Sequence, residues 1–262
     1  MNVSNIVNGW NFRQLANVVI DTDTLKERRA IKGGDIVFCK TDYLDKLFED
    51  VDDLVEPITL ITHCSDHSIT ASTFQNRPSC IQKWFAQNAD YQHPNLIPIP
   101  IGIENHDGPS KGTCIDTNFI KELPIKQDIK QDAVYVNFND THPDRTNVRQ
   151  FLSCHPNCFV RNETLPSKDY HLEMSRFALV ASPRGNGIDC HRTWEALLVG
   201  SIPIVKKHFI YDSWIELPII QIESWQELND FDAFKQKVIQ KLKNGVNLNA
   251  LSMDFWRKQV LE

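Results

Sequence analysis

The sequence predicts an α/β fold built from two βα units. Short runs rich in β-branched residues alternate with stretches of helical periodicity, which is the order that builds a parallel sheet covered by helices. Residues 105–131 are rich in Gly, Pro, Asp and Lys without sustained periodicity, as expected of a linker. A chain of 262 residues is long enough for two such units with adequate cores. The predicted domains are 1–125 and 126–245, followed by a C-terminal segment, 246–262.

The first unit is expected to contain three strands and two helices. The strands are residues 35–39 (DIVFC), 58–62 (ITLIT) and 96–101 (LIPIPI), and the helices are 43–51 and 78–86. In the helix 78–86, Trp84 and Phe85 are expected to pack in the core.

The second unit is expected to contain five strands, at 134–138, 158–161, 177–181, 202–205 and 219–222. Its helices are predicted at 144–153, 167–175, 190–199 and 224–243. A terminal helix over 249–261 places Leu251, Phe255 and Val260 at helical spacing, and this helix can cross back to the first unit.

Composition and charge exclude several classes of protein. No run of 18 apolar residues is present, and the first residues, MNVSNIVNGWNFRQ, lack the pattern of a signal peptide. The formal net charge of −6, without a Lys/Arg run, argues against a nucleic-acid partner. The seven cysteines form no set of zinc-ligand pairs, which favours reduced thiols. We therefore expect a soluble cytoplasmic protein without a transmembrane segment.

The segment FALVASPRGNGIDCHRTWEALLVGSIPIVKK, residues 177–207, carries the clearest sign of function. A buried strand precedes SPRGNGIDCHR, which lies where open α/β sheets bind their ligands. Gly185 and Gly187 allow close approach of a ligand. The following helix start, with Arg184 and Arg192, suits a diphosphate. The alternative is an ordinary helix start with an ion pair between Arg192 and Glu195.

The string SPRGNGIDCHRTWEALLVGSIPIV resembles the signature of exostosin-like glycosyltransferases, which have the GT-B architecture. The residues that match in order are Arg192, Glu195, Ala196, Gly200, Ile202 and Pro203. The segments ITHCSDHSI and WFAQNADYQHPNLIPIPIGIEN resemble small viral and bacterial members.

The resemblance implies two Rossmann-like domains facing a cleft, with a UDP-sugar donor held mainly by the second domain and no obligatory metal or other cofactor. It also implies that Glu195 binds the ribose hydroxyls and that nearby basic residues meet the diphosphate. Arg145, near a helix start after the strand 134–138, is a further candidate for a phosphate contact. The predicted donor-binding residues are Ser182, Arg184, Gly185, Asn186, Gly187, His191, Arg192, Glu195 and Arg145.

The stretch THCSDHS follows the predicted strand 58–62 and offers candidates for a catalytic base. Inverting sugar transfer needs a group that removes the proton of the acceptor hydroxyl. Asp66 is the first choice, His63 the second and His67 the third. The alternative is that Ser65 and Asp66 cap the next helix.

Three further residues are predicted to bind the carbohydrate acceptor. Asn88, Glu104 and Asn105 follow predicted elements near the same edge, and amides and carboxylates bond well to sugar hydroxyls. For Asn88 the alternative is a helix C-cap. Asp21 and Asp23 form an Asp-x-Asp sequence similar to the metal motif of other glycosyltransferases, but they lie far from the signature, and no metal ligand is predicted.

The predicted function is transfer of a sugar, xylose or another UDP-linked sugar, to a carbohydrate hydroxyl, with inversion and without a metal, in glycan biosynthesis. One alternative is an inactive sugar- or nucleotide-binding module. A less favoured alternative is a dinucleotide-dependent oxidoreductase, which needs glycines after its first strand, whereas DIVFCKTDYLDK has none.

Overall fold

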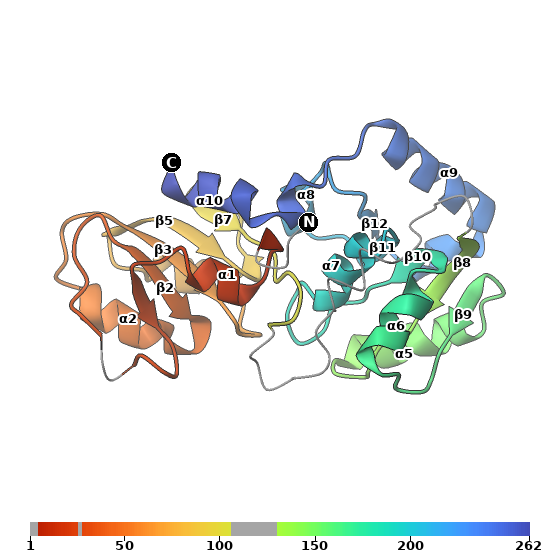
Figure 1. Cartoon of the computed structure of the whole chain (residues 1–262), viewed down its shortest axis with the longest axis horizontal. Helices are drawn as coiled ribbons and strands as arrows, with labels where there is room; N and C mark the ends of the chain where they lie inside the picture. Colours follow the sequence, from red (N-terminus) through yellow and green to blue (C-terminus); the bar gives the residue numbers. More distant parts are fainter. Residues whose placement is uncertain (1–4, 26–27, 106–129) are drawn as a thin grey trace.

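A computed structural model describes residues 5–25, 28–105 and 130–262 (Figure 1). It confirms the α/β class, because these residues form two five-stranded sheets in which neighbouring strands are parallel. None of the helices in these ranges is long and apolar enough to cross a membrane. The six cysteines within the described residues are all free thiols.

The first sheet adds its strands in chain order. It consists of β1 (Val18–Ile20), β2 (Ile36–Lys40), β3 (Ile58–His63), β5 (Ile81–Ala86) and β7 (Leu96–Pro98). A small second layer pairs β4 (Ile69–Thr70) with β6 (Ala89–Asp90). The helices of this half are α1 (Gly9–Arg13), α2 (Leu44–Val51) and α3 (Ala71–Gln75).

The second sheet reverses its strand order in the middle. Its order is β12 (Ile220–Ile222), β11 (Ile202–Lys206), β10 (Phe177–Ala181), β8 (Gln131–Val136) and β9 (Cys158–Val160). The chain places β9 on one side of β8 and β10 on the other, and the carboxyl ends at such a reversal are where open α/β sheets commonly bind ligands. The helices are α5 (Pro143–Ser153), α6 (Ser167–Met174), α7 (His191–Leu198), α8 (Phe209–Asp212) and α9 (Phe231–Lys243).

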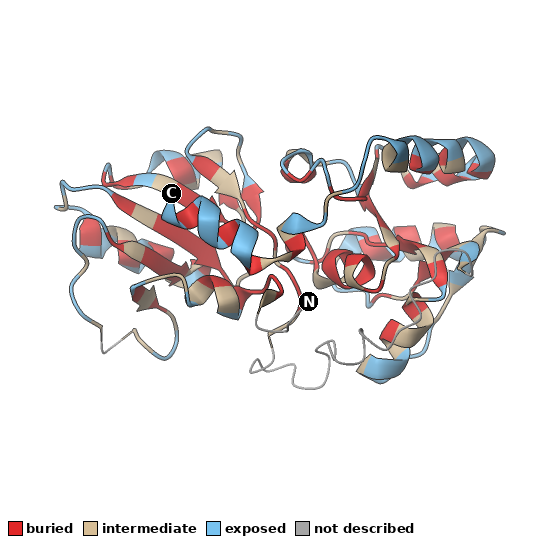
Figure 2. Cartoon of the chain, turned by 45° about the horizontal axis from the view of Figure 1, so that its top comes forward, coloured by how far each residue is buried: buried red, intermediate tan, exposed pale blue. Residues whose placement is uncertain are grey.

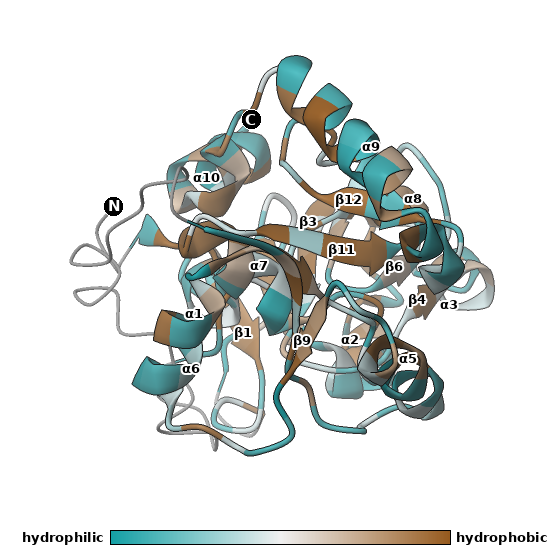
Figure 3. Cartoon of the chain, turned by 90° about the vertical axis from the view of Figure 1, so that its right-hand side faces the viewer, coloured by the Kyte–Doolittle hydropathy of each residue, from teal (hydrophilic) through white to brown (hydrophobic). Residues whose placement is uncertain are grey.

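One hydrophobic core connects the two sheets. Its buried members include Ile61 and Phe85 of the first sheet together with Val180 and Trp194 of the second half, and Figure 2 shows buried strands in both sheets. A second cluster lies under α9, where Phe234 packs with Ile204 and Ile220. Figure 3 shows the apolar strands β11 and β12 beside α9, whose own residues are mixed in hydropathy.

The C-terminal helix, α10 (Met253–Leu261), packs against the first half of the chain. The rings of Trp256 and Phe12 lie 5.9 Å apart. The Lys83 ammonium donates to the Gln259 carbonyl at 2.8 Å. Just before α10, the Val7 amide donates to the Leu251 carbonyl at 3.0 Å, which joins the two ends of the described chain.

Three predicted elements need correction. The predicted helix 78–86 is wrong: residues 81–86 are the strand β5, in which Trp84 and Phe85 are buried between β3 and β7. The predicted strand 96–101 ends at Pro98, because Pro98 and Pro100 have no N–H for a ladder. The predicted helix 224–243 divides into a 3₁₀ turn, Trp225–Asn229, and α9.

Asp230 separates the two parts of that last segment, because its carboxylate accepts from the Ala233 amide at 3.0 Å and starts α9. The other predicted elements occur with ends shifted by up to three residues, including the terminal helix, which begins as a 3₁₀ turn at Asn249–Leu251. Most of the predicted linker, and the predicted boundary between residues 125 and 126, lie outside the described residues.

Candidate functional site

A polar cleft of about 710 Å³ lies at the carboxyl ends of the first sheet's strands and reaches α7 of the second half. It contains seven residues singled out from the sequence, from both halves of the chain: His63, Asp66, His67, Glu104, Asn105, Asn186 and His191. Asp42, which follows β2, and Gln87, which follows β5, also line it. Because parallel strands end at one edge, segments distant in sequence meet here.

Asp66 lies in this cleft with its side chain exposed, and it contacts Asn186, in the loop between β10 and α7. The Asn186 amide donates to Asp66 Oδ2 at 3.2 Å. The alternative role of Ser65 and Asp66 as a helix cap is wrong, because the N-cap of α3 is Thr70, whose hydroxyl accepts from the Thr73 amide. The carboxylate of Asp66 is thus available to a ligand.

His63 is almost fully buried, and both of its ring nitrogens are engaged. Nε2 donates to the Pro100 carbonyl at 3.0 Å, which assigns the proton to that nitrogen. Nδ1 then accepts from the Cys64 amide at 2.7 Å. Burial lowers the pKa of His63 to about 3. These contacts make His63 a poorly suited base and give it a structural role at the end of β3.

His191 and Glu104 meet on the other wall of the cleft. His191 Nδ1 lies 2.7 Å from the Gly102 carbonyl oxygen, and Nε2 lies 3.4 Å from Glu104 Oε2. His191 is the first residue of α7, so its ring lies at the positive end of that helix. Asn105 accepts from the Trp10 amide at 2.9 Å through Oδ1 and also lines the cleft.

Asn88 does not face the cleft, contrary to its predicted role in acceptor binding. Its side chain is buried, and Oδ1 accepts from the amides of Ile188 and Asp189 at 3.0 and 3.1 Å. Nδ2 donates to the Ser65 carbonyl at 3.2 Å. The alternative of a helix C-cap is also wrong, because Asn88 follows the strand β5. Asn88 instead ties the first half of the chain to the loop that precedes α7.

Gly187 and Asp189 complete this connection between the halves. A Cβ at Gly187 would lie 2.6 Å from Asn88 Nδ2, so only glycine allows the loop to approach Asn88 so closely. Asp189 Oδ2 accepts from the Ile101 amide at 2.9 Å and from the Trp194 indole at 2.7 Å. Burial raises the pKa of Asp189 to about 6.

Arg145 and Arg192 lie just beyond the carboxyl ends of β8 and β10, where they donate to the Pro183 and Asn137 carbonyls. Their guanidinium carbons are each 5.7 Å from the centroid of the Phe138 ring. Arg145 is buried and donates to the carbonyls of Asn139 and Arg184 at 2.9 and 2.8 Å. Burial lowers the pKa of Arg145, and the charge of Arg192 lowers it further.

Arg192 donates through Nε to the Asn137 carbonyl and to the Tyr170 hydroxyl, at 2.9 and 3.1 Å. Within residues 5–25, 28–105 and 130–262, neither Arg145 nor Arg192 forms an ion pair with a carboxylate. The ion pair between Arg192 and Glu195, given above as the alternative to donor binding, is therefore not formed among the described residues. The two guanidinium groups therefore lie near each other without an ion pair to a carboxylate among the described residues.

Glu195 lies one turn further along α7 and is 7% exposed. Its Oε1 is 3.7 Å from His171 Nε2, a nitrogen that has no hydrogen-bond partner among the described residues. Burial alone would raise the pKa of Glu195, but the contact with His171 and the charges of His171, His191 and Arg192 lower it overall. Glu195 is therefore held as a carboxylate beside the arginine pair.

The remaining residues that were predicted to bind the donor, Ser182, Gly185 and Arg184, make contacts within the second half of the chain. Ser182 is buried, and its hydroxyl lies 2.9 Å from the Thr193 hydroxyl, so its predicted contact with the donor is wrong for the side chain. Gly185 packs on Arg145, where a Cβ would lie 3.1 Å from a guanidinium nitrogen. The Arg184 guanidinium folds back onto the Asn186 carbonyl at 2.9 Å.

Asp21 has its carboxylate occupied. Oδ2 lies 2.6 Å from Arg13 Nε, and Oδ1 accepts from the amides of Asp23 and Thr24, both at 3.0 Å. Across the described ranges, no cluster of three or more potential metal ligands occurs.

Sequence reasoning missed Asp189, Tyr170 and His171. Asp189 lies within the segment SPRGNGIDCHR, so the resemblance that singled out its neighbours could have pointed to it as well. Tyr170 and His171 lie in α6, and only the packing of α6 beside α7 brings them to Arg192 and Glu195.

No protein-family model matches this chain, and no curated protein matches it in sequence. The resemblance to exostosin-like glycosyltransferases therefore stays a prediction that rests on the matched residues.

Proposed function

We propose that this protein is a GT-B glycosyltransferase that moves a sugar from a UDP-sugar to a carbohydrate hydroxyl, with inversion and without an obligatory metal. The observation that carries the proposal is the pair Arg145 and Arg192, which lack a carboxylate partner in the described chain at the strand-order reversal of the second sheet. A diphosphate supplies the negative charge that this pair lacks, and bidentate arginine contacts suit its oxygens.

The neighbours of the arginine pair support the same donor. Glu195 lies beside Arg192 as a carboxylate, the group that accepts hydrogen bonds from ribose hydroxyls. His191, which precedes Arg192 in the sequence, lines the cleft at the first turn of α7, a helix end that favours anions. The identity of the base as uridine comes from the family resemblance.

Asp66 is the proposed catalytic base. In the proposed step, its carboxylate takes the proton of the acceptor hydroxyl while that oxygen bonds to the anomeric carbon of the donor. The bond from the anomeric carbon to the diphosphate oxygen breaks at the same time, and UDP leaves with its negative charge. Arg192 and the N-terminus of α7 stabilise the charge that develops on the leaving diphosphate.

A sugar- or nucleotide-binding module without catalytic activity is the second candidate, since the same cleft and arginine pair bind a ligand without chemistry. An oxidoreductase is less well supported. The segments that follow β2 and β8, residues 41–46 and 137–142, contain no glycine for a dinucleotide turn.

Calorimetric titration with UDP tests the donor site. Arg192→Ala is expected to weaken UDP binding by about 1.5–3 kcal/mol, because it removes charge-assisted hydrogen bonds. Arg149→Ala is the matched control: Arg149 also lies over Phe138, at 4.8 Å, but it pairs with Asp140 at 3.1 Å. The control is expected to bind UDP as the wild type does.

Activity is tested by incubating the protein with a panel of UDP-sugars and measuring slow hydrolysis of the donor. Release of UDP from one of them supports the transferase, and UDP binding without any turnover supports the binding module. A wild-type protein that binds NAD(H) and not UDP contradicts both.

A further inference from the structure

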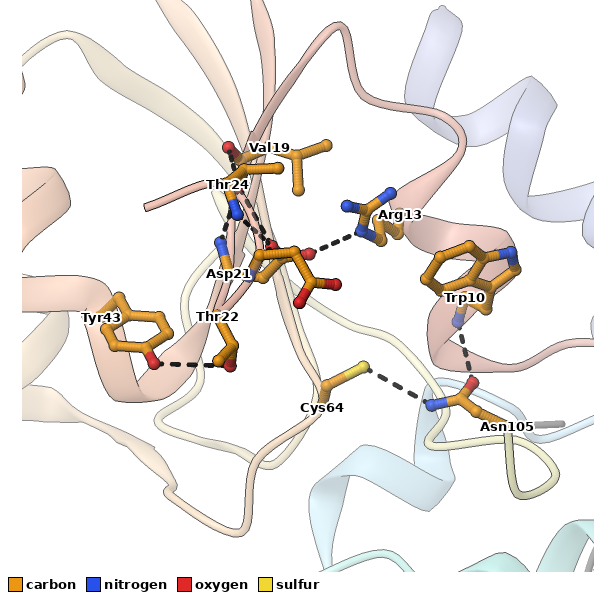
Figure 4. A network of polar contacts seen from close by, with 10 residues as sticks. Trp10, Arg13, Val19, Asp21, Thr22, Thr24, Tyr43, Cys64 and Asn105 are labelled. Carbon is orange, nitrogen blue, oxygen red and sulfur yellow. Dashed lines mark hydrogen bonds and ion pairs between the residues drawn. The ribbon is translucent and has the colours of Figure 1, made fainter. Parts of the chain in front are cut away.

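A second, smaller pocket adjoins the polar cleft at the carboxyl ends of β1 and β2. Its volume is about 240 Å³, and it shares Cys64 and Asn105 with the cleft. Its other lining residues are Trp10, Arg13, Asp21, Thr22, Asp23, Phe38 and Lys40. Figure 4 shows Trp10 beside Asn105, with Arg13 reaching towards Asp21. A ligand that fills the cleft can therefore continue into this pocket.

Trp10 is unusual among the tryptophans of this protein. The chain has six, and the other five are at most 6% exposed, whereas Trp10 is 40% exposed. Burial of aromatic surface is strongly favourable, so a tryptophan left open beside a cleft offers a ready surface for a ligand.

The position of Trp10 is fixed by its surroundings. Its backbone amide donates to Asn105 Oδ1 at 2.9 Å, and the Arg13 guanidinium carbon lies 4.7 Å from its ring centroid. Arg13 is held in turn by Asp21 at 2.6 Å. The indole is therefore preorganised, with one face covered by Arg13, which lowers the entropy cost of stacking a ligand on it.

The helix that carries Trp10, α1, packs closely against residues that line the cleft. Next to Trp10, a Cβ at Gly9 would lie 2.4 Å from Cys64 Sγ and 2.7 Å from His63 Nδ1, so α1 packs directly on the end of β3. Cys64 itself has a φ of 61°, a conformation that non-glycine residues adopt rarely and that is found at functional sites. Gly9, next to Trp10, is therefore packed against His63 and Cys64, which lie three and two residues before Asp66.

The charge of the pocket indicates the class of ligand. Two cations, Arg13 and Lys40, are balanced by two carboxylates, Asp21 and Asp23. This balance contrasts with the unpaired Arg145 and Arg192 and disfavours an anion. Since Arg13 and Asp21 pair with each other, Asp23 and Lys40 are the groups for a neutral ring with many hydroxyls, which donate to a carboxylate and accept from an ammonium while the C–H face of the ring stacks on the indole. The volume is below the roughly 300 Å³ of pockets for drug-sized ligands and suits a single ring.

We propose that the Trp10 pocket binds a neutral sugar ring of an oligosaccharide acceptor, next to the ring that receives the transferred sugar at Asp66. This proposal rests on the proposed function for the role of that oligosaccharide. It assigns the acceptor at least two rings, one in the cleft and one against Trp10, so a free monosaccharide lacks half of the binding surface.

The test begins with a glycan array that covers common plant, animal and microbial oligosaccharides, followed by titration of the tightest neutral one. Trp10→Ala is expected to weaken its binding about tenfold or more, as truncation of a central tryptophan does. Trp10→Phe keeps an aromatic face and is expected to retain most of the affinity. Phe255→Ala, which removes an aromatic side chain with 37% exposure elsewhere, is the control and is expected to change nothing.

UDP is titrated against the same proteins. UDP affinity is expected to stay within about twofold of wild type in Trp10→Ala, as for an ordinary surface substitution. A loss of UDP affinity in Trp10→Ala shows that Trp10 stacks on the donor base and overturns the proposal, as does a wild-type protein that binds no neutral oligosaccharide. Failure of wild-type protein to bind UDP contradicts the transferase alone, since Trp10-dependent binding of an oligosaccharide still stands.

Discussion

Asp66 and His63 lie three residues apart at the end of β3, and their surroundings give them different chemical roles. Asp66 is exposed in the cleft and accepts a hydrogen bond from the neutral Asn186 amide on the opposite wall. His63 is buried with both nitrogens bonded, and its pKa is lowered to about 3 by burial. Of the two candidate bases, the carboxylate is therefore the one that can take a proton from a bound hydroxyl.

Asp66→Asn is expected to reduce sugar transfer by about a hundredfold or more, the typical effect of removing a general base. The amide keeps the shape of the side chain, and Asp66 caps no helix, so stability and UDP affinity are expected to stay unchanged. Rates of transfer and UDP titrations measure the two effects separately.

Asp42→Asn is the matched control for this prediction, because Asp42 lines the same cleft. Its transfer rate is expected to stay near that of wild type. An equal loss in Asp42→Asn and Asp66→Asn means that the negative charge of the cleft matters, and near wild-type transfer by Asp66→Asn removes Asp66 from the mechanism.

At the scale of elements, the loop between β10 and α7 owes its shape to contacts from the first half of the chain. Asn88 accepts two amide hydrogens of this loop, and Gly187 gives it the room to do so. Asn88 has a φ of 54°, a left-handed conformation that asparagine tolerates better than most residues. Asn88 thus supplies the acceptor for two amides of the loop and also adopts the left-handed backbone conformation at the end of β5.

Asn88→Ala is expected to lower the free energy of unfolding by about 2–4 kcal/mol, because it leaves buried amide and carbonyl groups without partners. Asn88→Gly loses the same hydrogen bonds but adopts the left-handed conformation without strain, so it is expected to destabilise less than Asn88→Ala. Denaturant unfolding of both variants measures the difference. Stability equal to wild type in Asn88→Ala contradicts the assigned role.

At the scale of the whole molecule, two buried titratable groups, one from each half of the chain, bond to the adjacent residues Pro100 and Ile101. The centroid of the His63 ring lies 5.4 Å from that of Phe12, and the ring donates to the Pro100 carbonyl, while Asp189 accepts from the Ile101 amide. The pKa of His63 is lowered from 6.5 to about 3, and that of Asp189 is raised from 3.8 to about 6, both mainly by burial. Their effects on the pH dependence of stability have opposite signs.

The unfolded chain binds a proton at His63 below pH 6.5, whereas the folded protein does not, so this residue destabilises the fold as pH falls from about 6.5 towards 3. His63→Gln removes that effect and keeps a donor for Pro100. Between pH 7 and pH 5, the stability of wild type relative to His63→Gln is expected to fall by about 2 kcal/mol.

Asp189→Asn is the control, because Asp189 changes the stability with pH in the direction opposite to His63. Folded Asp189 binds its proton from about pH 6 downward, whereas the unfolded chain does so only near 3.8, so acid relieves the cost of burying this carboxylate. Over the same pH range, wild type is expected to gain about 1 kcal/mol relative to Asp189→Asn. Denaturant unfolding at both pH values measures both differences, and parallel pH profiles of wild type and His63→Gln contradict the burial effect.

The sequence by itself determined the α/β class, most of the strands and helices, and the segments that supply the cleft. Apolar runs such as 58–62 and 177–181 predict buried parallel strands, and polar residues after them must lie at the carboxyl edge, which is why Asp66, Asn186 and His191 were found. Residues 81–86 were predicted as helix and form a strand, because the periodicity of a short apolar run is compatible with either structure.

Only the tertiary structure decided which of these polar residues face the cleft. Asn88, Ser182 and His63 have the right chemistry and the right place in the chain, but tertiary packing buries them: Asn88 against the loop before α7, and the other two within their own halves. The partners of Arg192 and Glu195 in α6, and the pocket at Trp10, depend on contacts between elements far apart in sequence. The physical reason is that an edge of a sheet is set by strand direction, a local property, whereas burial and charge pairing are set by everything that packs against that edge.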